Sequence, residues 1–509
     1  MIRLVDTNRG WLCYEFTEGK ESSEQLGAPR ISHVDHVTRL TTFLPMMIHG
    51  PMNLPLEIIR LVVGEATRVP AAFDTSFKAS ILEDLETVTD AIRESMKIKL
   101  ALCLVSKSFH DIAIEFLYEI VTLRQLQCVN PLIDLLRHKS EPCKPYRGRW
   151  CRRLEIAIGE GSDEYRGGMW PEEIHTLWAL VYSCPRLVIF LCAVRYNMGM
   201  RHRCSLIPIR FRIPRTLFQL IASNCSQTLK RMEIHGDTAI RLDRVELLLK
   251  SCTVLEVCRI ERVDLYDPEW GVYDSPYESD PDECGVELGW VSDVEWDGEA
   301  MTESRRARKK VKWPVEPLRQ ETVLPNLHTL EIYPFCLHPG ILTLPSLRCV
   351  GYRLDMLTTS ELSKTILDRV LGDTHHRLTH VTYWGPTTMI WDILDRLPNV
   401  TELTFGAILN DNTAVVSPHR HLCLSNINLV WSIYCPATTT YFLAAIAKAV
   451  SDGLFPSLHD VRVWECRVEI EQAQRDLFSS LGLMLEFTTR FQSRFIKCVQ
   501  FRLVPLHFR

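Results

Sequence analysis

The chain has 509 residues, with 46% hydrophobic residues, 24% charged residues and a formal net charge of -5. This length is too great for one ordinary compact core, so we expect several domains, or one domain followed by a repeat array. The composition is typical of a soluble globular protein. The small net charge gives no support to a whole-chain surface for nucleic acids or membranes.

The cysteines and the apolar runs indicate where the protein resides. None of the 18 cysteines forms a Cys-x-x-Cys pair, so zinc modules of the ribbon or finger type are not indicated. We interpret the cysteines as small buried hydrophobes in a reducing compartment. The first residues lack a signal-peptide core, and the most apolar later run is broken by Pro185 and Arg186. We therefore expect a cytoplasmic and/or nuclear protein with no membrane segment.

The N-terminal quarter of the chain divides into an extension and a helical region. Residues 1–49 show no sustained period, and we expect a loosely structured extension there. A helical module follows over residues 50–125 and opens with "GPMNLPLEIIRLVV", in which Pro55 suits the first turn of a helix. We interpret a polar stretch at about 66–98 as an insertion. Such an insertion is tolerated as a surface loop, because the entropic cost of closing a loop grows slowly with its length.

The stretch "LALCLVSKSFHDIAIEFLYEIVTL" at 100–123 carries the second apolar part of this module. Its apolar positions recur at intervals of four, three, four and four residues and predict a helix with one buried stripe: Val105, Phe109, Ile112, Phe116 and Ile120. Leu102 and Leu104 are spaced by two residues and do not follow this helical spacing. They therefore need a second apolar partner, which is either the first helix or another chain.

From about residue 126 to residue 509, short β-type runs recur after a similar phrase. Clear examples are "LPNLHTLEIY" (324–333), "LPSLRCVGYRL" (344–354) and "LPNVTELTFG" (397–406). Because side chains alternate along a strand, Leu330 and Ile332 share one face. One strand with one helix cannot bury its apolar face alone, but stacked units form a continuous core. The alternative is an α/β domain with parallel strands.

Amphipathic stretches between the phrases predict the helices of these units. The clearest are "TSELSKTILDRVLG" (359–372) and "TYFLAAIAKAVSDG" (440–453), and each ends in glycine, as helices commonly do. The phrase resembles leucine-rich repeats, with irregular spacing and mostly without the asparagine ladder of that family. The resemblance implies an α/β fold class, in which the helical module is followed by an irregular leucine-rich-repeat-like solenoid.

A charged insert at about 264–320 interrupts the repeats. Residues 264–299 hold 13 Asp or Glu and no Lys or Arg, whereas "RRARKKVK" (305–312) has six basic residues. An acidic block followed by a basic block does not form a packed core, so we expect a disordered loop here. The basic run reads either as a nuclear import signal or nucleic-acid contact, or as part of a solvated loop. We favour the second and expect no nucleic-acid partner.

The sequence contains few motifs that indicate catalysis or metal binding. It contains no Gly-x-x-x-x-Gly-Lys phosphate loop, no His-Glu-x-x-His and no Gly-x-Ser-x-Gly. His419, His421 and Cys423 would share one side only in an extended strand, and no fourth metal ligand is evident. We interpret these histidines as polar loop residues. We therefore expect no enzyme activity, no catalytic residue, no cofactor and no metal.

The two apolar parts of the helical module, "LPLEII" and "LCLVSKSFHDIAIEFLY", resemble an F-box in the form common among large fungal F-box proteins. Members of that family dock on the Skp-type adaptor of a cullin–RING ubiquitin ligase. Two departures are the long separation of the two parts and Phe109 in place of a common tryptophan. The resemblance implies these adaptor-binding residues: Leu54, Pro55, Ile58, Ile59, Leu102, Leu104, Val105 and Phe109.

The resemblance implies a function for the whole chain. The protein would be a substrate-recognition subunit, with the module on the adaptor and the repeats on an unknown target protein. One alternative is that the module only caps the N-terminal end of the repeats, because repeat arrays need caps. The other is a repeat-based protein-interaction scaffold with no role in ubiquitin transfer.

Overall fold

The computed structural model describes only part of the chain, namely residues 2–7, 11–16, 55–78, 85–124, 128–138, 146–158, 179–194, 211–212, 215–236, 238–261, 263–264, 322–332, 342–353, 372–385, 390–407, 420–430, 436–464 and 472–488. The chain divides into two compact units, Met1–Ile58 and Ile59–Arg509. From residue 265 onward, the predicted charged insert and its basic run 305–312 lie outside the described residues.

The first unit contains an antiparallel hairpin of β1 (Ile2–Thr7) and β2 (Trp11–Phe16). Ile2 lies opposite Phe16, and Thr7 lies opposite Trp11, so the two strands pair along their whole length. This part of the predicted loosely structured extension therefore contains regular secondary structure.

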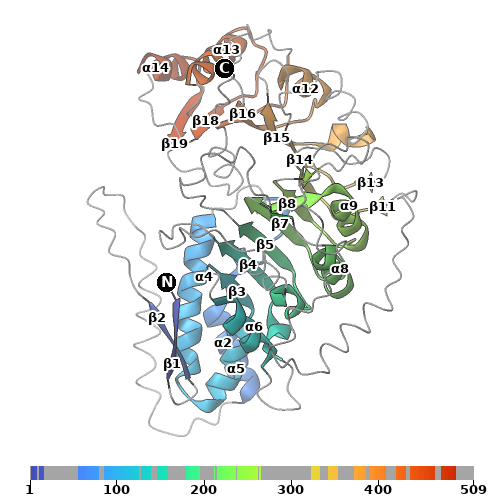
Figure 1. Ribbon diagram of the computed structural model, residues 1–509. Helices are drawn as coiled ribbons and strands as arrows, with labels where there is room; N and C mark the ends of the chain where they lie inside the picture. The colour runs from blue at the N-terminus through green and yellow to red at the C-terminus, as the bar shows by residue number, and fades with distance from the viewer. Residues whose placement is uncertain are drawn as a thin grey trace, which may run out of the picture. The chain divides into compact units, whose positions relative to one another are not determined.

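The second unit is built on one twelve-stranded sheet in which each neighbouring pair is parallel (Figure 1). Its strands stand side by side in chain order: β3 (Ile120–Leu123), β4 (Arg153–Ile158), β5 (Ile189–Val194), β7 (Arg231–Gly236), β9 (Val257–Ile260), β12 (Thr329–Ile332), β14 (Cys349–Arg353), β15 (His380–Gly385), β16 (Glu402–Ala407), β17 (Asn426–Val430), β18 (Asp460–Trp464) and β19 (Met484–Thr488). A doubly wound α/β sheet reverses its strand order, whereas this order is that of repeats stacked one after another. The first repeat strand begins at Ile120, inside the predicted helical module.

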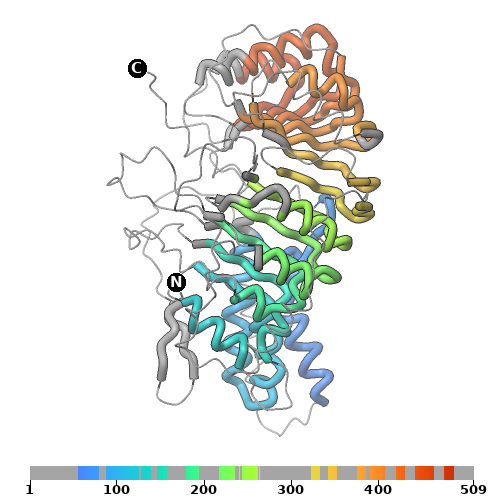
Figure 2. The backbone as a smooth tube through the Cα atoms, turned by 45° about the vertical axis from the view of Figure 1, so that its right-hand side comes forward, coloured from blue at the N-terminus to red at the C-terminus, as the bar shows by residue number. Residues whose placement is uncertain are grey.

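Helices precede the strands and lie along one face of the sheet (Figure 2). They are α6 (Val129–Arg137), α8 (Arg215–Asn224), α9 (Leu242–Ser251), α12 (Ile390–Arg396), α13 (Pro436–Ser451) and α14 (Gln472–Ser480). Shorter parallel ladders join β6 (Phe211–Arg212), β8 (Thr238–Arg241) and β10 (Val263–Asp264), and β11 (Thr322–Val323) with β13 (Leu342–Thr343). None of the described helices is long and apolar enough to cross a membrane.

The helix predicted at 440–453 is confirmed, and its glycine has the expected role. Gly453 has a φ of 69°, the left-handed region that glycine adopts without strain. The backbone N–H of Leu454 donates to the carbonyl oxygen of Ala449 over 2.9 Å, which closes the helix end. The helix predicted at 359–372 lies outside the described residues.

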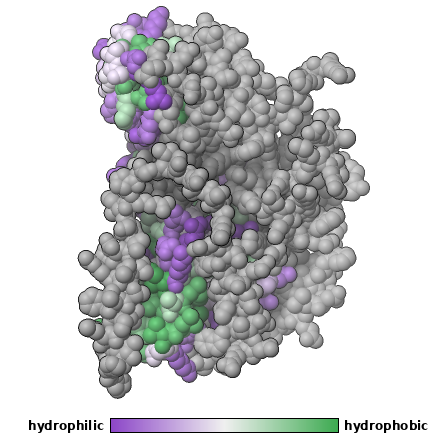
Figure 3. Space-filling view, turned by 90° about the vertical axis from the view of Figure 1, so that its left-hand side faces the viewer, coloured by the Kyte–Doolittle hydropathy of each residue, from purple (hydrophilic) through white to green (hydrophobic). Residues whose placement is uncertain are grey.

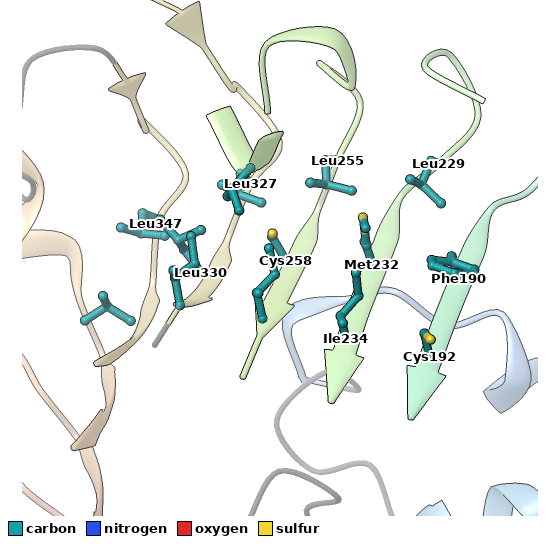
Figure 4. Packing of buried hydrophobic residues seen from close by; sticks show 14 of the residues in the cluster. Phe190, Cys192, Leu229, Met232, Ile234, Leu255, Cys258, Leu327, Leu330 and Leu347 are labelled. Carbon is teal, nitrogen blue, oxygen red and sulfur yellow. The ribbon is translucent and has the colours of Figure 1, made fainter. Parts of the chain in front are cut away.

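The apolar core consists of columns of side chains that run across the strands (Figure 4). In one column, Cys258 pairs with Met232 on one side and with Leu330 on the other. All three are fully buried, as are Leu327 in the preceding turn and Ile332 further along the strand. The prediction that Leu330 and Ile332 share one buried face is therefore confirmed.

The turns before the strands are linked by backbone hydrogen bonds from one repeat to the next. The N–H of His328 donates to the carbonyl oxygen of Glu256 over 3.0 Å, and that of Arg348 donates to His328 over 2.9 Å. In the same way, the N–H of Thr379 donates to the carbonyl oxygen of Arg348 over 2.9 Å, and the N–H of Thr401 donates to that of Thr379 over 2.8 Å. Residues at this position therefore form a regular row, with one side chain from each repeat.

His421, a candidate metal ligand in the sequence, is buried in one of these turns. Its Nδ1 accepts from the backbone N–H of Leu424 over 3.1 Å, so its Nε2 carries the proton and donates to the carbonyl oxygen of Leu397 over 2.9 Å. The ring thus joins two successive repeats. Among the described residues, which exclude His419, no group of three or more His, Cys, Asp or Glu side chains could hold a metal ion.

The opposite face of the sheet carries polar side chains on several strands, because side chains alternate along each strand. Arg259 bridges two carboxylates on neighbouring strands, Glu233 at 2.9 Å and Glu331 at 3.2 Å. Burial alone would raise the pKa of Glu233, but Arg231, Arg259 and His235 hold it well below its ordinary value. The charges of this cluster are therefore paired both along one strand and across neighbouring strands.

Most described cysteines are free and buried, as the sequence predicts for small hydrophobes: Cys103, Cys151, Cys184, Cys192, Cys225, Cys252, Cys258 and Cys349. Burial raises the pKa of the Cys225 and Cys252 thiols to about 12. Both groups are therefore protonated at neutral pH, and a thiol is a far weaker nucleophile than a thiolate.

The core column gives a direct test of the repeat packing. Leu330→Ala removes a fully buried side chain and should lower the free energy of unfolding by about 2–5 kcal/mol. Val323→Ala is the control, because Val323 lies in the same repeat but is 50% exposed, and its effect should stay within about 0.5 kcal/mol. Urea denaturation followed by circular dichroism measures both. Equal effects would contradict the described core.

Candidate protein-docking surface

Helix α2 (Leu56–Thr67) buries one stripe and exposes apolar residues on another side. Its buried residues, Ile59, Val63 and Thr67, are spaced by four, as expected for one helical face. The first two join the core that also contains the repeat strands. Leu61 and Val62 lie off this stripe and are 64% and 50% exposed.

The stretch 100–123 holds the end of one helix, a second helix and strand β3, so the prediction of one helix from Val105 to Ile120 is wrong. Helix α4 (Leu85–Cys103) ends before Leu104, and α5 (Lys107–Leu117) follows after a short turn. The Ser106 hydroxyl accepts a 3.2 Å hydrogen bond from the N–H of Phe109 and caps α5. A serine at this position favours the start of a helix over its interior. At the other end, Ile120 belongs to strand β3 and not to the helix.

Two pairs of large apolar side chains are exposed on these helices, and we call them the apolar patch: Leu61, Val62, Leu104 and Val105. The second pair forms the turn between α4 and α5, with exposed fractions of 76% for Leu104 and 49% for Val105. Figure 3 shows hydrophobic residues gathered on one face, at the height where Figure 1 draws α2 and the lower part of α4. Contiguous apolar patches on a protein surface mark interaction sites.

Helices α2 and α5 of the module pack against each other. Arg60 on α2 forms an ion pair with Glu115 on α5. A Cβ atom placed on Gly64 would lie 3.5 Å from the ring of Phe116, so the α2 backbone closely approaches α5 at this glycine. These contacts join α2 to the C-terminal half of α5, and Leu104 and Val105 precede the start of that helix.

The structure divides the predicted adaptor-binding residues into three groups. Leu104, Val105, Pro55 and Ile58 are exposed. Ile59 is buried, and Leu102 and Phe109 are partly buried against the core. Leu54 lies outside the described residues. Leu61 and Val62 are further exposed apolar residues of α2 that the predicted adaptor-binding set does not contain.

The predicted insertion at about 66–98 is only partly a loop. Its second half belongs to α4, which begins at Leu85. Its first half includes the short 3-10 helix η2 (Pro70–Ala72). Both halves contribute to a second apolar cluster: Val69, Ala72, Val88, Ile92 and Ile120. This stretch is therefore packed against the repeat array, and the surface-loop interpretation is wrong for these residues.

Comparison with known proteins identifies no family for the chain. No family model matches it, and no curated protein matches it. Among solved structures, it is similar to a chain in the crystal structure of the Rad7 and Elc1 complex in yeast. The alignment covers 91% of this chain and 98% of that chain, with 8% sequence identity and a TM-score of 0.31.

The Ser106 cap gives a prediction for the turn that carries half of the patch. Ser106→Ala removes the acceptor for the Phe109 N–H and should cost about 1 kcal/mol of stability. Ser106→Asp supplies an equivalent acceptor and should keep most of that stability. Urea denaturation compares the two variants with the wild type. If Asp is as destabilising as Ala, the side chain of Ser106 does not act as a cap.

Proposed function

We propose that this protein is a substrate-recognition subunit of a Skp–cullin–F-box ubiquitin ligase. The helices α2, α4 and α5 would form an F-box-like module that binds the Skp-type adaptor. The array would be a degenerate leucine-rich-repeat solenoid that binds a target protein. The apolar patch carries this proposal, because its four large side chains remain exposed beside a core that buries comparable ones.

The chemistry of the patch supports a protein partner. Leucine and valine side chains bind through burial of apolar area, at roughly 25 cal/mol per Å² removed from water. Arg60 adjoins Leu61 in the sequence and Lys107 lies two residues after Val105, and both are exposed, so they can form a polar rim. Protein interfaces commonly combine an apolar centre with such a rim.

The sequence supports the assignment of that partner to the Skp class. The "LPLEII" and "LVSKSF" segments occur in the order found in F-boxes, and the structure exposes Ile58, Leu104 and Val105 from them. We infer that no residue of this chain is catalytic. Its contribution to ubiquitin transfer would be proximity, since holding a target beside the transferring enzyme raises the effective concentration.

Adaptor binding tests the proposal. The full chain, co-expressed with a Skp-type adaptor, should co-purify with it. Leu61→Glu combined with Leu104→Glu places two carboxylates in the patch and should weaken binding by at least about 30-fold, because truncation of one central interface residue typically costs about 2 kcal/mol. Both side chains are mostly exposed, so the variant should fold normally.

The control is Leu422→Glu, because Leu422 is 56% exposed on a repeat turn and lies outside the helical module. This variant should bind the adaptor as the wild type does. Absence of adaptor binding by a folded wild-type chain would refute the ubiquitin role and favour the repeat-based scaffold. Equal losses in the patch and control variants would show that the patch is not the docking surface.

A further inference from the structure

The segment that follows α2, residues 72–77, lies against repeats far away in the sequence. The Thr75 hydroxyl donates a hydrogen bond to the carboxylate of Glu256. The Thr75 carbonyl oxygen accepts a 2.9 Å hydrogen bond from Nε2 of His328. The hydroxyl and the carbonyl of one buried residue are therefore bound by two successive repeats.

Phe77 makes the second set of contacts. Its ring packs edge-on against the imidazoles of His328 and His380, with centroids 5.6 and 4.9 Å apart. The guanidinium carbon of Arg348 lies 5.7 Å from the ring centroid, within the range of a cation–π contact. Asp74 shapes the segment between these contacts, because its Oδ1 accepts from the N–H of Ser76 over 2.9 Å.

The recognising side chains form a regular series, which we call the recognition row: Glu256, His328, Arg348 and His380. The first three occupy the same turn position in successive repeats, and their backbones are joined by the hydrogen bonds described above. Adjacent strands lie about 4.8 Å apart, so the array presents one side chain at each such step. A polypeptide that crosses the strands can therefore contact each repeat through one or two residues.

We propose that the recognition row is a binding site for a linear peptide that carries a hydroxyl residue followed, two positions later, by an aromatic residue. Residues 75–77 occupy this site in cis and compete with such a partner. The groups that recognise Thr75 and Phe77 belong to the repeats, and the recognised groups lie within three consecutive residues. A partner with the same short pattern would offer the same contacts. This proposal does not depend on adaptor binding.

The energetics follow from competition between the segment and the partner. When the segment occupies the row for 90–99% of the time, the apparent affinity for an external peptide falls by roughly 10- to 100-fold. Removal of the Thr75 and Phe77 side chains deletes the contacts with Glu256, Arg348 and His380 and leaves one backbone hydrogen bond to His328, so the row should open to an external peptide. The proposal therefore predicts a gain of binding, which general damage to the fold does not produce.

The experiment uses a fluorescently labelled peptide with the sequence of residues 71–78, "AAFDTSFK". Fluorescence anisotropy measures its binding to the full wild-type chain and to the variant Thr75→Ala/Phe77→Ala. The variant should bind at least about 10-fold more tightly than the wild type. A control peptide with alanine in place of the threonine and the second phenylalanine should not bind to either chain.

Further variants locate the bound peptide. Arg348→Ala, combined with Thr75→Ala/Phe77→Ala, should abolish the tighter binding of the peptide. The control is Arg420→Ala in the same background. It should leave the tighter binding intact, because Arg420 is exposed and is not part of the recognition row. The single change Phe77→Ala should give a smaller gain and serves if the double variant unfolds. If the folded, opened chain binds the two peptides equally, or no better than the wild type, the segment is a permanent structural attachment and the proposal is wrong.

Discussion

Each strand of the array has apolar side chains that only its two neighbours and the adjacent helices can cover. The continuous columns through Cys258 and Leu330 satisfy this requirement inside the array, but they leave the first strand, β3, in need of a partner. Ile59 and Val63 from α2 and Ile112 from α5 join the same core and supply it. The helical module therefore caps the array, while Leu61, Val62, Leu104 and Val105 on the same module stay exposed.

The sequence predicted the repeats well because their signal is local. Leu327, Leu330 and Ile332 stand within one phrase, and alternation along a strand places them correctly. The helix break at Ser106 was missed because apolar spacing continued across it, although a serine before Phe109 is a capping signal. Periodicity describes which residues share a face, and it does not detect where the backbone starts a new helix.

The remaining errors come from contacts between distant residues. The stretch at 66–98 is polar on average, yet Thr75 meets Glu256 and His328, which belong to repeats much later in the chain. No local pattern encodes such pairings. The exposure of Leu61 and Val62 has a related cause, since only the packing of Ile59 and Val63 decides which apolar side of α2 stays outside.

The buried thiols have a practical consequence for studies of motion in the array. Cys225 and Cys252 sit at the start of successive repeat turns, fully shielded and protonated. An alkylating reagent reaches them only when the surrounding repeat opens, so the alkylation rate of each thiol measures how often its own repeat opens. The native sequence thus carries built-in probes of local breathing along part of the sheet, without any engineered label.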